Sequence, residues 1–204
     1  MKRLTILIFL MVFIGITCFS QGFEGGVLGG LNASQVDGDT YSGYKKPGIV
    51  VGGYVLTNLS RTLFVGMELK FAQKGSRNID SLAINGRIKY VMRLSYVELP
   101  VYFGIRTSDR ISVLFGLSPG YLLSSAEYDD YGKFAPEEQH PFNSIDLQAL
   151  LGFRFKLSKR LFVDLRGAYS VMPIRKQQGN PLWYWKNNQF SNLLNTTVLY
   201  RLDF

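Results

Sequence analysis

Cysteine and histidine are almost absent from this sequence, which holds one of each, Cys18 and His140. A single cysteine excludes a disulfide framework, and one histidine without further cysteines excludes an ordinary zinc site. Hydrolases of the acyl-transfer type need a serine with a histidine that takes its proton, and no serine stands at a recognisable spacing from His140. We therefore expect no enzymatic activity, no bound metal and no cofactor.

Long apolar runs are also scarce, since the only one covers residues 4–16. Two basic residues precede it, and Cys18 and Ser20 place small residues at positions −3 and −1 of a cleavage after Ser20. This is the layout of a secretory signal peptide. The run is shorter than the about 20 apolar residues that a membrane-spanning helix needs. We predict a signal peptide at residues 1–20 and one domain at residues 21–204. An uncleaved anchor and a lipoprotein acylated at Cys18 are the alternatives.

Amphipathic helices are missing too, because no later segment of helical length carries apolar residues at i, i+3, i+4 and i+7. What recurs is the alternation of apolar and polar residues, which is typical of strands with one apolar face. It is clearest where Met67 and Leu69 lie on one face and Glu68 and Lys70 on the other. Eight candidate strands follow one another, at residues 23–36, 48–57, 62–74, 95–106, 111–124, 145–156, 161–171 and 192–204.

The connections between these strands alternate strictly between short and long. Three are tight turns of Ser, Asn or Asp that end in arginine, at residues 57–61, 107–110 and 157–160. Four are longer and more polar, at residues 37–47, 75–86, 125–143 and 176–191. Outer-membrane barrels have short periplasmic turns and long extracellular loops. The sequence therefore predicts an all-β fold, an eight-stranded antiparallel up-and-down transmembrane β-barrel located in the outer membrane.

The chain is basic, with a formal charge of +8, of which Lys2 and Arg3 contribute two. The remaining charge is spread along the domain and not gathered in runs. Such charge suits phosphate-bearing partners, including lipopolysaccharide and other anionic lipids at a membrane surface. We therefore predict outer-membrane lipid and lipopolysaccharide as partners, and we expect no binding of nucleic acid because there is no basic cluster.

Three segments resemble a known family. They are Gly-Gly-Leu-Asn-Ala-Ser at residues 29–34, Met-Glu-Leu-Lys-Phe-Ala-Gln-Lys-Gly-Ser at residues 67–76 and Leu-Ser-Tyr-Val-Glu-Leu-Pro at residues 94–100. Together they are similar to the Bacteroidota outer-membrane β-barrel domain, often called PorT-like. The resemblance implies an eight-stranded barrel in the outer membrane of that phylum and implies no shared activity. The terminal Phe204 resembles the signal that the barrel insertion machinery reads, so we expect that machinery as a partner.

If the apolar faces meet lipid, the polar faces point into the barrel. The interior of an eight-stranded barrel is only wide enough for side chains to fill, and buried charges must be paired. We predict a salt-bridged plug that stabilises the barrel, with a narrow ion path or an acid/base pair as the alternative. The predicted interior charge network comprises Glu68, Lys70, Glu98, Arg106, Asp146, Arg154, Asp164, Arg166 and Arg201.

We expect function in the external loops, because binding residues are often carried by loops on a rigid scaffold. Trp183, Tyr184 and Trp185 could stack on a sugar or on a partner's side chains, or could anchor the membrane interface. We predict a non-enzymatic protein with a structural or interaction role, which binds a ligand or an extracellular or periplasmic protein partner. The alternatives are a narrow porin-like pore for small solutes and a soluble lipocalin-like exported barrel with an apolar ligand inside.

Overall fold

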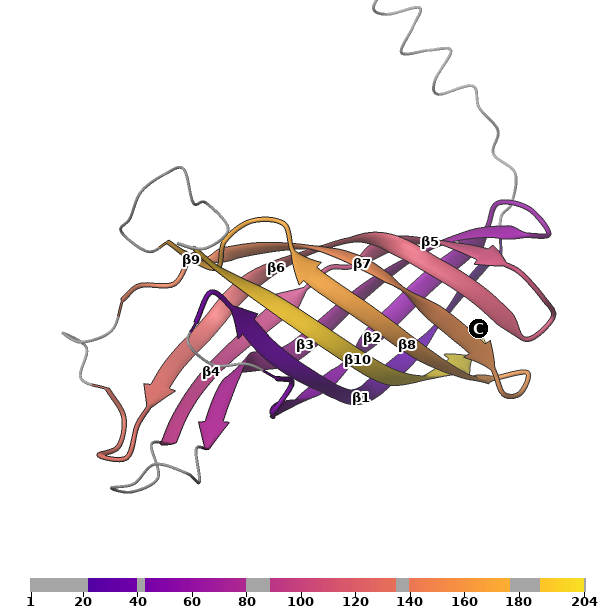
Figure 1. The fold of residues 1–204 in the computed structure, drawn as a ribbon. Helices are drawn as coiled ribbons and strands as arrows, with labels where there is room; N and C mark the ends of the chain where they lie inside the picture. The colour runs from indigo at the N-terminus through magenta and orange to yellow at the C-terminus, as the bar shows by residue number, and fades with distance from the viewer. Residues whose placement is uncertain (1–21, 40–42, 80–88, 135–139, 177–187, 204) are drawn as a thin grey trace, which may run out of the picture.

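Antiparallel strands form a closed ring in the computed structural model, which describes residues 22–39, 43–79, 89–134, 140–176 and 188–203 (Figure 1). The sheet order is β1-β2-β3-β4-β6-β7-β8-β10, and β10 pairs back with β1. No helix in these ranges is long and apolar enough to cross a membrane. The strands are β1 (Phe23–Asp37), β2 (Lys46–Asn58), β3 (Leu63–Ile79), β4 (Lys89–Glu98), β5 (Val101–Arg106), β6 (Ile111–Tyr128), β7 (Ile145–Lys156), β8 (Leu161–Ser170), β9 (Arg175–Lys176) and β10 (Asn188–Leu202).

Eight of these strand paths run the length of the barrel. The strands β4 and β5 are two halves of one path, because both pair with β3 on one side and with β6 on the other. The interruption falls at Leu99 and Pro100, and proline lacks the N–H that a strand interior needs. The two-residue β9 pairs only with the start of β10 among the described strands. The predicted eight-stranded barrel is therefore confirmed.

The three predicted short turns share one hydrogen-bonding pattern. In each, the hydroxyl of Ser60, Ser108 or Ser158 accepts bonds from the backbone N–H groups two and three residues ahead, at 3.0–3.4 Å. Serine favours turns because its side chain replaces a backbone partner in this way. All three turns lie at the end of the barrel where β10 ends, which we call the turn end (Figure 1). The opposite end, with the long connections, is the loop end.

The strands reach further toward the loop end than the sequence predicts. Segments expected as loops belong partly to strands, since β3 continues to Ile79, β6 to Tyr128, and β10 already begins at Asn188. Hydropathy does not alternate clearly in these extensions. The reason is that an outward face needs apolar residues only where it meets lipid, whereas the backbone ladder continues in water.

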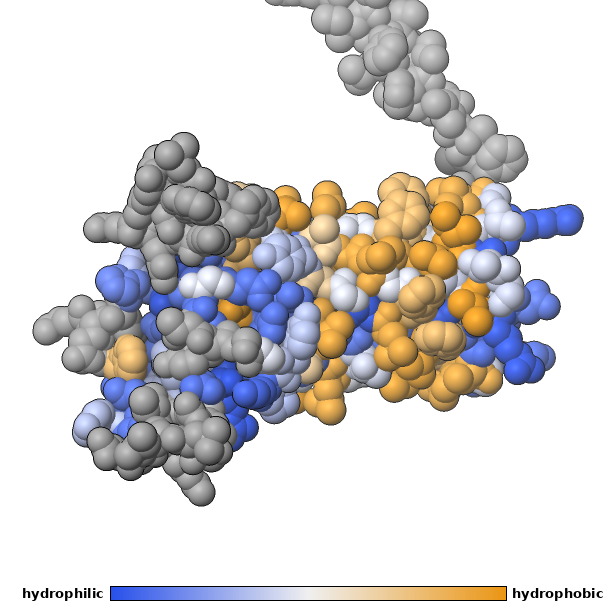
Figure 2. All heavy atoms as spheres, viewed as in Figure 1, coloured by the Kyte–Doolittle hydropathy of each residue, from blue (hydrophilic) through white to orange (hydrophobic). Residues whose placement is uncertain are grey.

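The outward-facing side chains form an apolar band around the part of the barrel nearer the turn end, as Figure 2 shows. Contiguous apolar surface on this scale marks contact with a membrane or a partner. This arrangement is the opposite of the one that the lipocalin-like alternative requires, in which the apolar faces would point inward. The band includes the exposed side chains of Val27, Leu31, Ile49, Val51, Val55, Met67, Leu69, Val101, Phe103, Ile105, Phe115, Leu117, Leu151, Phe153, Leu165, Leu194 and Val198.

Candidate functional site

A chain of ion pairs runs through the interior of the barrel. It begins with Arg154, which donates two hydrogen bonds of 2.8 Å to Asp164. Asp164 also pairs with Arg166. Arg166 in turn donates to Glu68 at 2.5 Å, and Glu68 lies 3.8 Å from the ammonium group of Lys70. Each basic group in this first part therefore contacts a carboxylate.

The chain continues from Lys70 toward the loop end. The Lys70 ammonium lies 3.4 Å from Glu98, and Glu98 also pairs with Lys74. The Lys74 ammonium is 3.2 Å from Asp146, which accepts a further hydrogen bond of 2.7 Å from the hydroxyl of Ser170. Acids and bases alternate along this chain of ion pairs. There are four of each, so the formal charges of these eight residues cancel.

This chain of ion pairs crosses the barrel interior from one wall to the opposite wall. Glu68 is on β3 and Arg166 is on β8, which are four positions apart in the ring of eight strand paths. None of the eight charged residues is more than 8% exposed. A cavity beside Lys70 and Gln148 measures about 20 Å³, close to the volume of a single water molecule. The arrangement thus fills this part of the lumen with paired side chains and leaves little room for a solute.

Seven of the nine predicted interior residues belong to this chain of ion pairs. The other two, Arg106 and Arg201, lie elsewhere. Arg106 lies at the turn end, where it donates to the carbonyl of Arg61 at 3.2 Å and stacks over the ring of Phe64 at 4.9 Å. Arg201 lies at the same end and pairs with Glu24 at 2.9 Å, both half-buried. These two arginines stand near the ends of their strands, where water reaches them.

The sequence pattern did not reveal three buried interior groups, Lys74, Glu127 and Arg175. Lys74 shares the inward face of Lys70, so extending that face to the last residue of the predicted strand would have found it. Glu127 faces inward and accepts hydrogen bonds of 3.1 and 2.5 Å from Arg175. Its orientation depends on a bulge at Leu123, where the register with β4 shifts by one residue. One inserted residue exchanges the two faces of the strand that follows, and no sequence signal marks it.

Several predicted residues lie outside the described ranges. These are the loop aromatics Trp183, Tyr184 and Trp185, the terminal Phe204 and the predicted signal peptide at residues 1–20. His140 is described and is exposed. In the part of the chain that the structure describes, no three His, Cys, Asp or Glu side chains are grouped to hold a metal ion.

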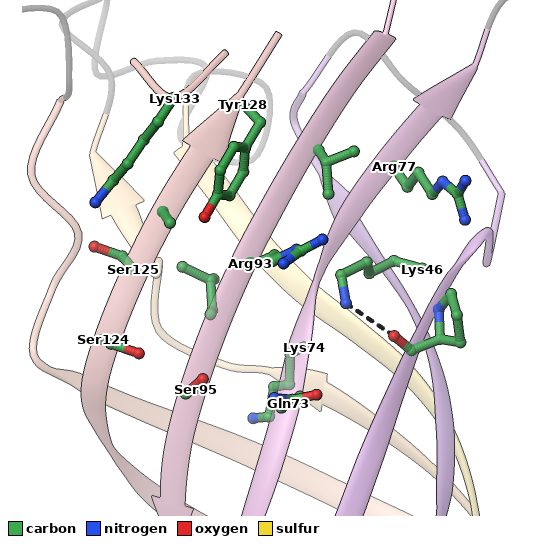
Figure 3. A pocket seen from close by; sticks show the side chains of 14 residues that line it. Lys46, Gln73, Lys74, Arg77, Arg93, Ser95, Ser124, Ser125, Tyr128 and Lys133 are labelled. Atoms are coloured by element: carbon green, nitrogen blue, oxygen red, sulfur yellow. Dashed lines mark hydrogen bonds between the residues drawn. The ribbon is translucent and has the colours of Figure 1, made fainter. Parts of the chain in front are cut away.

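A second charged site lies at the loop end, where β2 and β3 separate. Their pairing ends at Val50 and Ala72, although both strands continue beyond it. A cleft of about 630 Å³ lies there, between the start of β2 and the strands β3, β4 and β6. Figure 3 shows that its lining is mostly basic and polar, with Lys46, Gln73, Lys74, Arg77, Arg93, Ser95, Ser124, Ser125, Tyr128 and Lys133, and Pro47, Val91, Leu94 and Ala126 complete it.

Apart from Lys74, which pairs with Glu98 and Asp146, the basic groups of the cleft have no carboxylate partner among the described residues. None of its described lining residues is a carboxylate, and no ion pair joins Lys46, Arg77 or Arg93 to an acid in the same part of the chain. Arg93 lies 5.1 Å from the ring of Tyr128. Lys46 is the first residue of β2, on the loop side of the apolar band. Burial lowers the pKa of Lys46, and the positive charges of Arg93 and Arg77 lower it further.

A closed antiparallel barrel with an apolar outer band and a charged, paired interior defines a class, the outer-membrane β-barrel proteins. Within that class, the chain belongs to the family of outer membrane protein β-barrel domains, whose match covers residues 19–176. The predicted location in the outer membrane is thereby supported at the level of the family. No curated protein matches the sequence.

Solved outer-membrane structures share this fold. The chain is similar to Neisserial surface protein A (NspA), with a TM-score of 0.55 and 14% identity over 90% of this chain and 100% of that one. It is also similar to Ail, the attachment invasion locus protein of Yersinia pestis, with a TM-score of 0.51 and 15% identity over 88% and 98% of the two chains. At these identities the likeness concerns the fold alone.

Proposed function

We propose that this protein is a non-enzymatic outer-membrane barrel with a structural or interaction role, which binds ligands or partner proteins at its loop end while its interior stays closed. The observation that carries the proposal is the chain of ion pairs across the lumen, above all the contact of Glu68 with Arg166 from opposite walls. Side chains that fill the lumen in this way act as a plug. Ligands or partner proteins would then bind at the exposed surfaces of the barrel and not in its lumen.

The proposal includes the route by which the barrel reaches the membrane. Residues 1–20 direct export and are removed, and Phe204 is read by the barrel insertion machinery. The proposal also places the domain in the PorT-like group of the Bacteroidota, which the segments at residues 29–34, 67–76 and 94–100 resemble. The chain belongs to the wider family of outer-membrane barrel domains, and this membership supports both export and membrane insertion.

Ion conductance tests the closed interior. The mature protein in a planar lipid bilayer should give no stepwise conductance. The double variant Glu68→Ala/Arg166→Ala removes the pair that crosses the lumen and leaves Asp164 with Arg154 and Lys70 with Glu98, so the charges still balance. We expect this variant to begin to pass small ions. Stable channels formed by the unaltered protein would favour the alternative, a narrow porin-like pore.

Glycan binding tests the loop aromatics. The protein in nanodiscs is applied to an array of immobilised glycans and compared with the variant Trp183→Ala/Tyr184→Ala/Trp185→Ala. Tyr131→Ala is the matched control, because Tyr131 is an almost fully exposed aromatic in another connection of the loop end. We expect the triple variant to lose glycans that the control retains. Equal binding by both would assign these aromatics to the membrane interface instead.

A further inference from the structure

The basic cleft lies directly beyond the edge of the apolar band. On β4 the outward-facing residues change from Val97 to Ser95 and then to Arg93. On β6 the change falls between Leu123 and Ser124, and Ser124 pairs with Ser95. The outward faces of the two strands therefore change from apolar to polar at the same level. Arg93 is the next outward-facing residue of β4 toward the loop end.

The position of Arg93 corresponds to the depth of lipid headgroups. It is four residues beyond Val97, which is about 13 Å along a strand at about 3.3 Å per residue. At a strand tilt of about 45° this is about 9 Å in height, and the headgroup layer of a leaflet is about 5–8 Å thick. An arginine side chain is long enough to reach back into that layer. The cleft thus opens where lipid phosphates would lie.

The charges in the cleft differ from those elsewhere on the barrel. At the turn end, Arg201 pairs with Glu24 and Arg160 with Asp203, and the basic pocket at that end also has the carboxylates of Glu24 and Asp109 in its lining. In the cleft the basic groups come mainly from β2, β3 and β4, and no described residue of its lining is a carboxylate. Within the described ranges no carboxylate balances them, so a bound anion would supply a counter-charge. The planar guanidinium groups of arginine bind phosphate with two parallel hydrogen bonds.

We propose that this cleft binds the phosphate groups of a phosphorylated glycolipid of the outer leaflet, with Arg77 and Arg93 as the main ligands and Lys46 as a third. The assignment rests on the proposed function, in which the loop end faces outward. The ring of Tyr128, beside Arg93, offers a surface for a sugar of the same headgroup.

The apolar surface below the cleft favours a lipid over a soluble anion. Leu69, Tyr121 and Leu123 lie on strands that line the cleft and are 59%, 58% and 55% exposed. One amphiphilic molecule would therefore contact both surfaces, with its phosphates in the cleft and its acyl chains on the band. A soluble anion would use only the upper contact.

The test uses the full mature protein, folded in a zwitterionic detergent and titrated with bisphosphorylated lipid A. The cleft variant is Arg77→Gln/Arg93→Gln. The matched control is Arg61→Gln/Arg110→Gln, which removes the same charge from two exposed turns at the other end. We expect the cleft variant to bind lipid A about tenfold more weakly or worse, since two charge-assisted contacts are lost, and the control to change by less than about twofold.

Two further ligands separate the sources of phosphate. Lipid A from which both phosphates have been removed should bind the unaltered protein as weakly as lipid A binds the cleft variant. Inorganic pyrophosphate should bind much more weakly than lipid A, because it has no acyl chains. Pyrophosphate binding as tight as that of lipid A would overturn the choice of a lipid. Equal losses in the cleft and control variants would show charge attraction without a site, and overturn the proposal.

Folding and orientation are checked on the same proteins. Every variant should retain the heat-dependent migration of a folded barrel on a denaturing gel. Intact cells carrying Tyr131→Cys are treated with a membrane-impermeant thiol reagent, which reports whether the loop end faces outward. Failure of this labelling would contradict the proposed function itself. If labelling succeeds and the cleft variant still binds lipid A like the unaltered protein, only the cleft assignment is wrong.

Discussion

Within the apolar band and beyond it, the barrel places basic side chains in opposite settings. Inside the band, Lys74 and Arg166 are buried and each contacts two carboxylates. Beyond the band, Arg77 and Arg93 line a cleft in which no described residue is a carboxylate. A charge in the lumen has little water around it and must be paired within the protein. A charge at headgroup depth is solvated, or is paired by a ligand.

The largest effect on stability is expected for Asp164, the interior acid between two arginines. Asp164→Ala should destabilise the barrel by about 3–5 kcal/mol, because it leaves buried guanidinium groups without their carboxylate. The free energy of unfolding is measured by urea titration in detergent micelles. Asp203→Ala, which removes an exposed partner of Arg160, is the control and should have a clearly smaller effect. Equal changes in unfolding free energy for the two variants would mean that burial of an ion pair does not increase its contribution to stability.

A smaller effect is expected where glycine makes room for an interior ring. A Cβ atom on Gly104 would lie 2.0 Å from the ring of Phe64. Gly104→Ala should therefore cost about 1–3 kcal/mol of unfolding free energy through overpacking. Gly53→Ala is the control, since the nearest atom to its Cβ is at 3.5 Å. Adding Phe64→Leu should restore part of the loss, and no recovery would speak against the steric cause.

The turns should contribute less than the interior. Ser60→Ala, Ser108→Ala and Ser158→Ala each remove one acceptor for backbone N–H groups, and each should cost about 0.5–1 kcal/mol. Because the turns are separate, the triple variant should show nearly the sum of the three. The same urea titration measures it. Ser124→Ala, for which no side-chain hydrogen bond is found in the described ranges, should leave the midpoint unchanged.

The smallest effect on stability is expected in the cleft. Arg77→Gln/Arg93→Gln should change the unfolding free energy by no more than about 0.5 kcal/mol. The sign should be a slight gain at low salt, because the substitution removes repulsion between like charges around Lys46. The gain should disappear near 1 M salt, where charges are screened beyond about 3 Å. A large loss would mean that these arginines hold the barrel together, as the interior ones do.

Much of the fold could be predicted from the sequence, and less of the candidate sites. The alternation along residues 62–74 placed Glu68 and Lys70 inside and Met67 and Leu69 outside, as the structure has them. The strand ends at the loop end were predicted too short, because the extensions of β3 and β6 stand in water and carry no apolar face. The cleft was missed for the same reason, since it is built on those extensions.

The sequence by itself determined the eight strand paths, their inward and outward faces within the apolar band and the three tight turns. These follow from local patterns that a bilayer and short turns impose on neighbouring residues. The tertiary structure alone decided that Glu68 meets Arg166, that the bulge at Leu123 turns Glu127 inward, and that Lys46 lies near Arg77 and Arg93. Such contacts depend on the register between strands and on the closure of the ring. The apolar and polar alternation of one strand is the same whichever strand lies across the lumen, so it cannot specify these contacts.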